Sequence, residues 1–306
     1  MRCISFGNRT ALATVLVRVH DDASFSDRLV CRVRGGRVLL QTFSAPKPVC
    51  RIRMLQGLGG PDRDSPVFRL RFTTFIVGTV CLPLIGFVFC IFISLIFHFD
   101  DSTATHCKVP NYLPSISASI SLIPERYIWR FCISLHAAPR FLAAVSYWNF
   151  YNICFKTQRI YQFLSFLNLL LNILENLGLL LLTYVCSSEN YWLHKNGFIT
   201  FIGSSILHML VTCLLWKIIK VYSVSPEEQT SYKWKIRLFF FNLILCIIAC
   251  YFYVRHNRYC EPGIYTCFAF CEYFVVFSNM AFHLTAYWDF GNKDVMVVTP
   301  PESKRF

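Results

Sequence analysis

Six long apolar stretches alternate with shorter polar segments along the chain. They cover residues 75–97, 127–148, 163–185, 197–219, 238–254 and 263–288. Each stretch is about as long as a helix that crosses a bilayer, which takes roughly 17–25 residues. The pattern predicts an all-α, polytopic membrane protein with six transmembrane helices in a domain over residues 67–290.

The composition agrees with this pattern and sets the two ends of the chain apart. The chain is 55% hydrophobic and 15% charged, whereas soluble domains average about 25% charged residues. Residues 1–66 are rich in arginine, proline and glycine and have no stretch long enough to span a bilayer. We expect a basic, disordered cytosolic extension there, with a mitochondrial targeting segment as the alternative, and a cytosolic tail over residues 291–306.

The distribution of basic residues predicts the orientation. Six helices place both termini on one side of the membrane, together with the loops after the second and fourth stretches. The basic residues on that side are Arg69, Arg71, Lys156, Arg159, Lys217, Lys220, Lys233, Lys235, Arg237, Lys293, Lys304 and Arg305; those on the other side are Lys108, Arg126, Lys195, Arg255 and Arg258. The positive-inside rule then predicts cytosolic termini. We attribute the net charge of +13 to topology and expect no nucleic-acid partner.

Four polar residues interrupt the third apolar stretch. Successive asparagines are four residues apart, at Asn168, Asn172 and Asn176, and Glu175 is adjacent to the last of them. These residues therefore share one helix face. A charged residue at this depth costs about 2.5–3.5 kcal/mol, so Glu175 should face protein or water. The spacing predicts a polar interior lined by this helix.

The cysteines suggest one disulfide and no metal site. Most of the 15 cysteines lie in apolar stretches, where a thiol packs as a small hydrophobic group, and no zinc-type spacing is found. Cys107 and Cys260 lie in loops on the side opposite the termini, where an oxidising lumen would favour a bridge. Cys186 is a competing partner, and two unpaired thiols are the alternative.

Short runs distributed along the chain resemble a known family. They include Thr103-Ala104-Thr105-His106-Cys107, Trp129-Arg130-Phe131-Cys132, His136-x-Ala138-Pro139-Arg140, Glu175-Asn176-Leu177, Arg255-His256-Asn257 and Asn279-Met280-Ala281-Phe282-His283. Over about residues 61–306 the chain resembles the FRAG/DRAM/Sfk family of membrane proteins. The resemblance implies a multi-pass protein of the Golgi membrane, with the endoplasmic reticulum as a second location. It also implies fatty-acid remodelling of glycosylphosphatidylinositol (GPI) anchors by reacylation of lyso-GPI with a saturated chain. GPI-anchored proteins and lyso-GPI would be the partners, without a resident cofactor, and acyl-CoA or another lipid would donate the acyl chain.

Acyl transfer to a lipid hydroxyl needs a base, donors to an oxyanion and groups that bind phosphate. The predicted catalytic residues are His136 or His208 as the base and Glu175 as the group that orients it, because imidazole exchanges a proton near neutral pH. The predicted substrate-binding residues are Arg130, Arg140, Asn172, Asn176, Glu272 and His283.

Less specific interpretations are open at this point. Arg140 could pair with Glu175 or Glu272 as a structural ion pair, and His208 could be an interhelical hydrogen-bonding group. The chain contains neither an HxxxxD nor a GxSxG motif. A non-catalytic lipid-binding or scaffold protein that supports a separate acyltransferase is therefore the main alternative, and a channel or transporter is a third.

Overall fold

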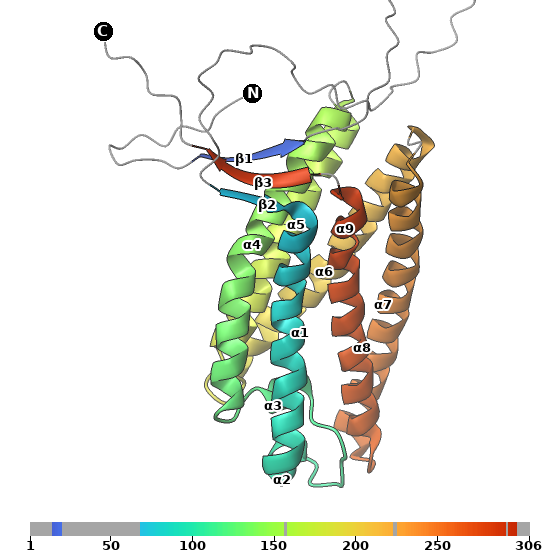
Figure 1. The fold of residues 1–306 in the computed structure, drawn as a ribbon. Helices are drawn as coiled ribbons and strands as arrows, with labels where there is room; N and C mark the ends of the chain where they lie inside the picture. The colour runs from blue at the N-terminus through green and yellow to red at the C-terminus, as the bar shows by residue number, and fades with distance from the viewer. Residues whose placement is uncertain (1–13, 20–67, 156–157, 223–224, 292, 299–306) are drawn as a thin grey trace, which may run out of the picture.

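A helix covers each of the six predicted stretches. The computed structural model describes residues 14–19, 68–155, 158–222, 225–291 and 293–298. The long helices run up and down side by side (Figure 1) and are α1 (Phe72–Phe97), α4 (Glu125–Cys154), α5 (Arg159–Tyr184), α6 (Tyr191–Tyr222), α7 (Pro226–Tyr259) and α8 (Ile264–Leu284). Short helices α2 (Phe99–Thr103), α3 (Ile116–Ser119) and α9 (Ala286–Asp289) lie between or after them. The predicted α-helical membrane architecture is confirmed.

Most helices extend beyond the apolar stretches that predicted them. α7 begins at Pro226, twelve residues before the predicted start at residue 238, and α4 ends at Cys154 instead of residue 148. Polar residues can continue a helix outside the membrane, so the apolar stretch gives only the minimum length. The last predicted helix is divided between α8 and α9 by Thr285.

By length and composition, five of the described helical segments could cross a membrane. They begin in α1, α5, α6, α7 and α8, the last of these continuing through α9. α4 has 30 residues, but its charged and aromatic polar residues lower its hydropathy. α4 nevertheless packs between α1 and α5, as expected for a bundle member.

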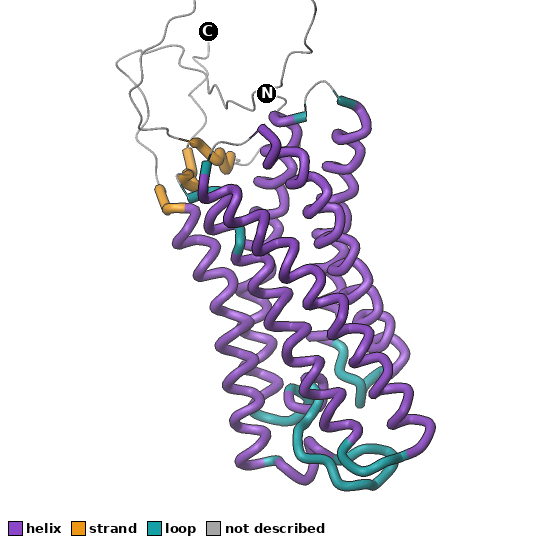
Figure 2. The backbone as a smooth tube through the Cα atoms, turned by 90° about the vertical axis from the view of Figure 1, so that its right-hand side faces the viewer, coloured by secondary structure: helices purple, strands orange, loops and turns teal. Residues whose placement is uncertain are grey.

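A small antiparallel sheet lies at one end of the bundle, opposite α2 and α3 (Figures 1 and 2). Its strands are β1 (Thr14–Val19), β2 (Phe68–Arg71) and β3 (Lys293–Val298), in the order β1-β3-β2. The sequence analysis did not predict this sheet and expected disorder at β1. The runs TVLVRV and KDVMVV are rich in β-branched residues, which favour strands when a partner is available. The rest of the 1–66 extension lies outside the described residues.

Two of the three apolar clusters among the described residues lie on either side of a polar layer. Phe72, Phe150 and Trp216 belong to the cluster nearer the sheet, and Phe87 and Trp129 belong to the cluster nearer α3. Asn172, Glu175 and Asn176 of α5 lie between Leu171 of the first cluster and Leu179 of the second. The polar layer is therefore bounded by apolar packing on both sides along α5.

α5 and α6 approach most closely at Gly178. A Cβ added there would lie 2.7 Å from the backbone nitrogen of Phe201 and 3.2 Å from the carbonyl oxygen of Gly197. Backbone atoms cannot move aside as a flexible side chain can, so Gly178→Ala should separate the two helices. We expect a loss of about 1–3 kcal/mol in the free energy of unfolding, measured by thermal unfolding of the detergent-purified protein.

Gly203→Ala is the matched control, because a Cβ at Gly203 on α6 meets no atom within 4 Å. Alanine stabilises a helix interior relative to glycine, so this variant should be at least as stable as the wild-type protein. Equal losses in both variants would contradict close packing as the cause.

Candidate functional site

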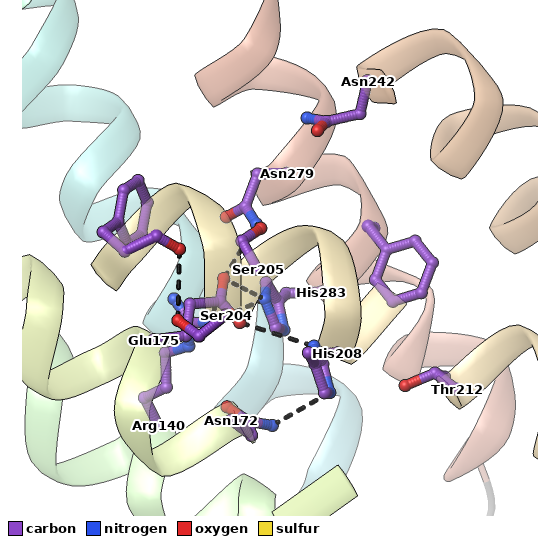
Figure 3. Close-up of polar contacts among 12 residues, drawn as sticks. Arg140, Asn172, Glu175, Ser204, Ser205, His208, Thr212, Asn242, Asn279 and His283 are labelled. Atoms are coloured by element: carbon purple, nitrogen blue, oxygen red, sulfur yellow. Dashed lines mark hydrogen bonds and ion pairs between the residues drawn. The ribbon is translucent and has the colours of Figure 1, made fainter. Parts of the chain in front are cut away.

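The polar layer brings together side chains from four helices. Arg140 of α4, Glu175 of α5, His208 of α6, and Asn279 and His283 of α8 point toward one another (Figure 3). The side chain of Glu175 is 0% exposed, that of Arg140 6% and that of His208 5%. The layer is therefore almost completely removed from solvent.

The carboxylate of Glu175 is the centre of this layer. Its Oε1 forms an ion pair with Arg140 Nη2 at 2.7 Å, accepts a hydrogen bond from Asn279 Nδ2 at 2.8 Å, and lies 3.1 Å from His283 Nε2. Its Oε2 lies 3.4 Å from His208 Nδ1. A buried carboxylate is tolerated when it is paired and hydrogen-bonded, and Glu175 has both kinds of partner.

The other polar residues of α5 contact the neighbouring helices as the sequence pattern predicted. Asn168 Nδ2 donates to Thr212 Oγ1 at 2.7 Å, and Asn172 Nδ2 lies 3.4 Å from His208 Nε2. Asn176 Nδ2 donates to the carbonyl oxygen of Ala137 on α4 at 3.0 Å. The polar face of α5 thus connects α4 and α6.

Three of the predicted site residues lie away from Glu175. His136 Nδ1 contacts the carbonyl oxygen of Thr79 on α1 at 2.7 Å. Glu272 Oε2 accepts from the backbone N–H of Ile116 at 2.9 Å, so Arg140 pairs with Glu175 and not with Glu272. Arg130 Nη2 donates to the carbonyl oxygen of Tyr184 at 2.9 Å, at the end of α5. The predicted set therefore divides into a central cluster and separate contacts.

Glu175, His208 and His283 also have the spacing of metal ligands. One ligand atom from each lies within 4.8 Å of the other two. The guanidinium of Arg140, however, contacts Glu175 Oε1 at 2.7 Å and His283 Nε2 at 2.6 Å. It already supplies the positive charge that a cation would bring to these two atoms, so we interpret the arrangement as an ion pair.

The central cluster places a histidine beside a carboxylate without a hydrogen bond between them. Nδ1 of His208 lies 3.4 Å from Glu175 Oε2, and neither atom has a hydrogen-bond partner among the described residues. Nε2 of the ring faces Asn172, and His208 is 4% exposed. The arrangement therefore lacks the hydrogen bond that orients the base in catalytic triads, and the ring is buried.

The disulfide between Cys107 and Cys260 is present, as the sequence analysis predicted. It joins the loop after α2 to the residue that follows α7. Two further contacts fix the same loop, because Gly263 donates its N–H to the carbonyl oxygen of Pro110 at 3.0 Å and Tyr112 donates its N–H to Thr266 Oγ1 at 2.8 Å. Cys186, the competing candidate, is a free thiol.

The sequence analysis missed a second histidine–carboxylate pair. His98 Nδ1 lies 2.7 Å from Oε1 of Glu125, whose side chain is 0% exposed. His98 directly follows α1 and Glu125 begins α4, 27 positions later, so no helical periodicity relates them. The available signal was a single glutamate at the start of an apolar stretch, next to Pro124.

It also missed a buried ion pair near the sheet. Lys235 Nζ contacts Asp289 Oδ2 at 2.6 Å, with side chains 1% and 0% exposed. Ser231 Oγ and the hydroxyl of Tyr147 donate to the same carboxylate, each at 2.5 Å. The sequence analysis had treated Lys235 only as one of the basic residues that predict topology.

Known proteins with similar sequences cover nearly all of the described bundle. The family model described as Frag1/DRAM/Sfk1/Cwh43P N-terminal domain matches residues 71–293. The protein named acyltransferase PGAP2 from Xenopus tropicalis is 54% identical over 247 residues, which are 80% of this chain and 98% of that protein. The protein of the same name from Danio rerio is 59% identical over 206 residues, 67% of this chain and 89% of that protein. Post-GPI attachment to proteins factor 2 from Drosophila melanogaster is 43% identical over 230 residues, 75% of this chain and 89% of that protein. No solved structure matches the chain.

Proposed function

Because this chain belongs to the Frag1/DRAM/Sfk1 family of membrane proteins, we propose that it remodels the lipid of GPI anchors by transferring a saturated acyl chain to lyso-GPI. The observation that carries the proposal is the identity of 54% and 59% to two relatives that are named acyltransferases. GPI-anchored proteins that carry the lyso lipid are the partners. The acyl donor is an acyl thioester such as acyl-CoA, or the ester of another lipid.

We propose that the protein crosses the Golgi membrane six times with both termini in the cytosol. The excess of basic residues at the sheet end supports this orientation. The Cys107–Cys260 disulfide supports it independently, because disulfides persist in oxidising compartments and this bond ties loops at the opposite end of the bundle. The end that carries α2 and α3 then faces the lumen.

Within this function we assign the polar layer a structural role. Arg140 and Glu175 neutralise each other, and the hydrogen bonds of Glu175 join α4 to α8. A buried ion pair of this kind can specify how helices pack. This assignment distinguishes the layer from the groups that perform acyl transfer.

The second candidate function is a scaffold that presents lyso-GPI to a separate acyltransferase. The burial of the polar layer favours it, because the residues that the sequence pattern selected for catalysis are closed to a lipid. The two functions differ in whether this chain suffices for transfer.

Reconstitution of the purified protein tests the difference. Liposomes would contain lyso-GPI and an isotope-labelled acyl donor, supplied either as stearoyl-CoA or as labelled phosphatidylcholine. We expect label in GPI without any further protein. Liposomes with the heat-denatured protein are the control. Transfer that appears only after a second membrane protein is added would overturn the enzyme proposal in favour of the scaffold.

A further inference from the structure

The hydroxyl that lyso-GPI offers for acylation lies close to the membrane surface. In a lysophospholipid of this kind the free hydroxyl is on the glycerol carbon next to the one that carries the phosphate. The phosphate and the glycan cannot enter the hydrocarbon core without losing their hydration. The group that accepts the hydroxyl proton should therefore lie at the lumenal interface. This inference rests on the proposed function.

The polar layer lies too deep to meet that hydroxyl. Arg140 is fifteen residues from Glu125, the first residue of α4, which corresponds to about 22 Å along a helix. The centre of a bilayer lies only about 15 Å from the edge of its hydrocarbon core. A lipid anchored by its phosphate at the surface would not bring its hydroxyl to His208.

The His98–Glu125 pair lies at the required depth. α1 has 26 residues, or about 39 Å, which exceeds the hydrocarbon thickness of about 30 Å. His98 follows its last residue, at the end of the bundle that carries α2 and α3 (Figure 1). The His98 side chain is 28% exposed, more than that of His208, so a substrate can reach it.

The geometry of the pair is that of an oriented base. The carboxylate of Glu125 is fully buried and contacts Nδ1 of His98 at 2.7 Å. The hydrogen of the neutral ring is thereby held on Nδ1, which leaves the lone pair of Nε2 available. Within the described part of the chain, Nε2 of His98 makes no hydrogen bond.

Packing between α1 and α4 holds the pair in place. Cys90 Sγ donates to the backbone carbonyl oxygen of Glu125 at 3.3 Å, and Phe87, Trp129 and Ile133 belong to the same apolar cluster. A carboxylate on a rigid element keeps the base that it contacts in position during a reaction. The carboxylate is fixed by the helices and not by a loop.

Two buried polar atoms, one of them in the pair itself, have no hydrogen-bond partner among the described residues. They are Oε2 of Glu125 and Oγ of Ser94. Ser94 is one helical turn before His98, and its side chain shares the same face of α1. Buried polar groups are ordinarily hydrogen-bonded, so a water molecule or a substrate hydroxyl at this position would complete the arrangement.

We propose that His98 is the general base of lyso-GPI reacylation and that Glu125 is its positioning residue. Nε2 of His98 takes the proton of the lipid hydroxyl while the hydroxyl oxygen attacks the acyl carbonyl carbon. A new ester C–O bond forms, and the C–S bond of a thioester donor, or the C–O bond of a lipid ester donor, breaks. The imidazolium returns the proton to the departing thiolate or alkoxide, so the ring ends the cycle neutral.

The test uses the reconstituted full-length protein with lyso-GPI and a labelled donor. His98→Gln should reduce the transfer rate by about 10²–10⁴-fold, the usual contribution of a general base. Glu125→Gln should reduce it less, because the amide still contacts His98 but no longer stabilises the imidazolium. His106→Gln is the control, since His106 is an exposed histidine in the same lumenal segment and contacts no carboxylate in the described structure. Its rate should equal that of the wild-type protein.

Two measurements separate a chemical role from a structural one. Imidazole added to the His98→Gly variant should restore part of the transfer, which a loss of folding would not allow. In the folded wild-type protein, diethylpyrocarbonate should inactivate transfer in step with modification of His98, and lyso-GPI should protect that residue.

The outcomes distinguish this inference from the function on which it rests. A wild-type protein that transfers no acyl chain from either donor overturns both. Wild-type transfer that His98→Gln leaves unchanged overturns the assignment of the base alone. Loss in His208→Gln with a folded protein, together with full activity in His98→Gln, would place the base in the polar layer instead.

Discussion

Glu175→Gln is expected to destabilise the bundle by about 3–5 kcal/mol, the usual cost of breaking a buried ion pair by removing one partner. Arg140 keeps its charge in this variant, although its side chain is only 6% exposed. Glutamine has nearly the size of glutamate, so the loss reflects charge and not a cavity. The measurement is thermal unfolding in detergent, followed by size-exclusion chromatography of the heated protein.

Two further variants show whether the uncompensated charge is the cause. The double variant Arg140→Gln/Glu175→Gln should recover much of the lost stability, because neither charge then remains buried. Glu189→Gln makes the same chemical change at a carboxylate that is 49% exposed and lies 3.7 Å from Arg130. A surface pair contributes about 0–1 kcal/mol, so this control should be nearly neutral. A double variant as unstable as Glu175→Gln would contradict the ion-pair explanation.

Loss of the Glu175 carboxylate and loss of the Glu125 carboxylate should affect acyl transfer in different ways. Glu175→Gln should lower the amount of folded protein and, with it, the total activity. Glu125→Gln should lower the activity per folded molecule. Comparing the two variants at equal concentrations of folded protein therefore separates the packing role of the polar layer from the chemistry at the lumenal end.

The polar layer could be predicted from the sequence because the spacing of the polar residues within a single helix, α5, indicates it. Asn168, Asn172, Glu175 and Asn176 lie on one face of α5, and helical periodicity is local information. Which residues they meet depends on how far each helix is shifted along its axis relative to its neighbours. His283 joins Glu175 for this reason, although it lies in the last turn of α8.

The contacts of His136 could not be predicted for the same reason, because they depend on which neighbouring helix its side chain meets. It shares a helix face with Arg140, four residues later, yet its Nδ1 contacts Thr79 of α1. A helix face is wide enough to touch two neighbouring helices, so two residues on it can have different partners. Sequence spacing alone identified the face but not the neighbour.

Helical periodicity relates residues within one helix, so it could not predict contacts between residues at the ends of different segments. His98 follows α1 and Glu125 begins α4, and the segment between them determines whether they meet. Lys235 lies in a basic segment that the positive-inside rule counts as cytosolic, but its side chain is 1% exposed. Without it, the side predicted to be cytosolic still has eleven of the twelve counted basic residues, against five on the other side, so the predicted orientation does not depend on Lys235.

Asp289→Asn should cost about 3–5 kcal/mol for the same reason as Glu175→Gln, but at the sheet end of the bundle. The Asp289 carboxylate accepts from Lys235, Ser231 and Tyr147. Its loss leaves the ammonium of Lys235 with Ser231 and, 4.5 Å from the ring centroid, with Trp216. These contacts do not neutralise a buried charge. Thermal unfolding in detergent measures the loss.

The partner variants decide between loss of charge pairing and loss of hydrogen bonds. Lys235→Met/Asp289→Asn removes both charges, so it should be more stable than Asp289→Asn alone. Asp294→Asn is the control, because Asp294 pairs with Arg69, whose side chain is 59% exposed, and a loss below about 1 kcal/mol is expected there. If the double variant were no more stable than Asp289→Asn, the hydrogen bonds from Ser231 and Tyr147 would account for the stability of this end. The buried charge of Lys235 would then contribute little to the packing of α7 against α9.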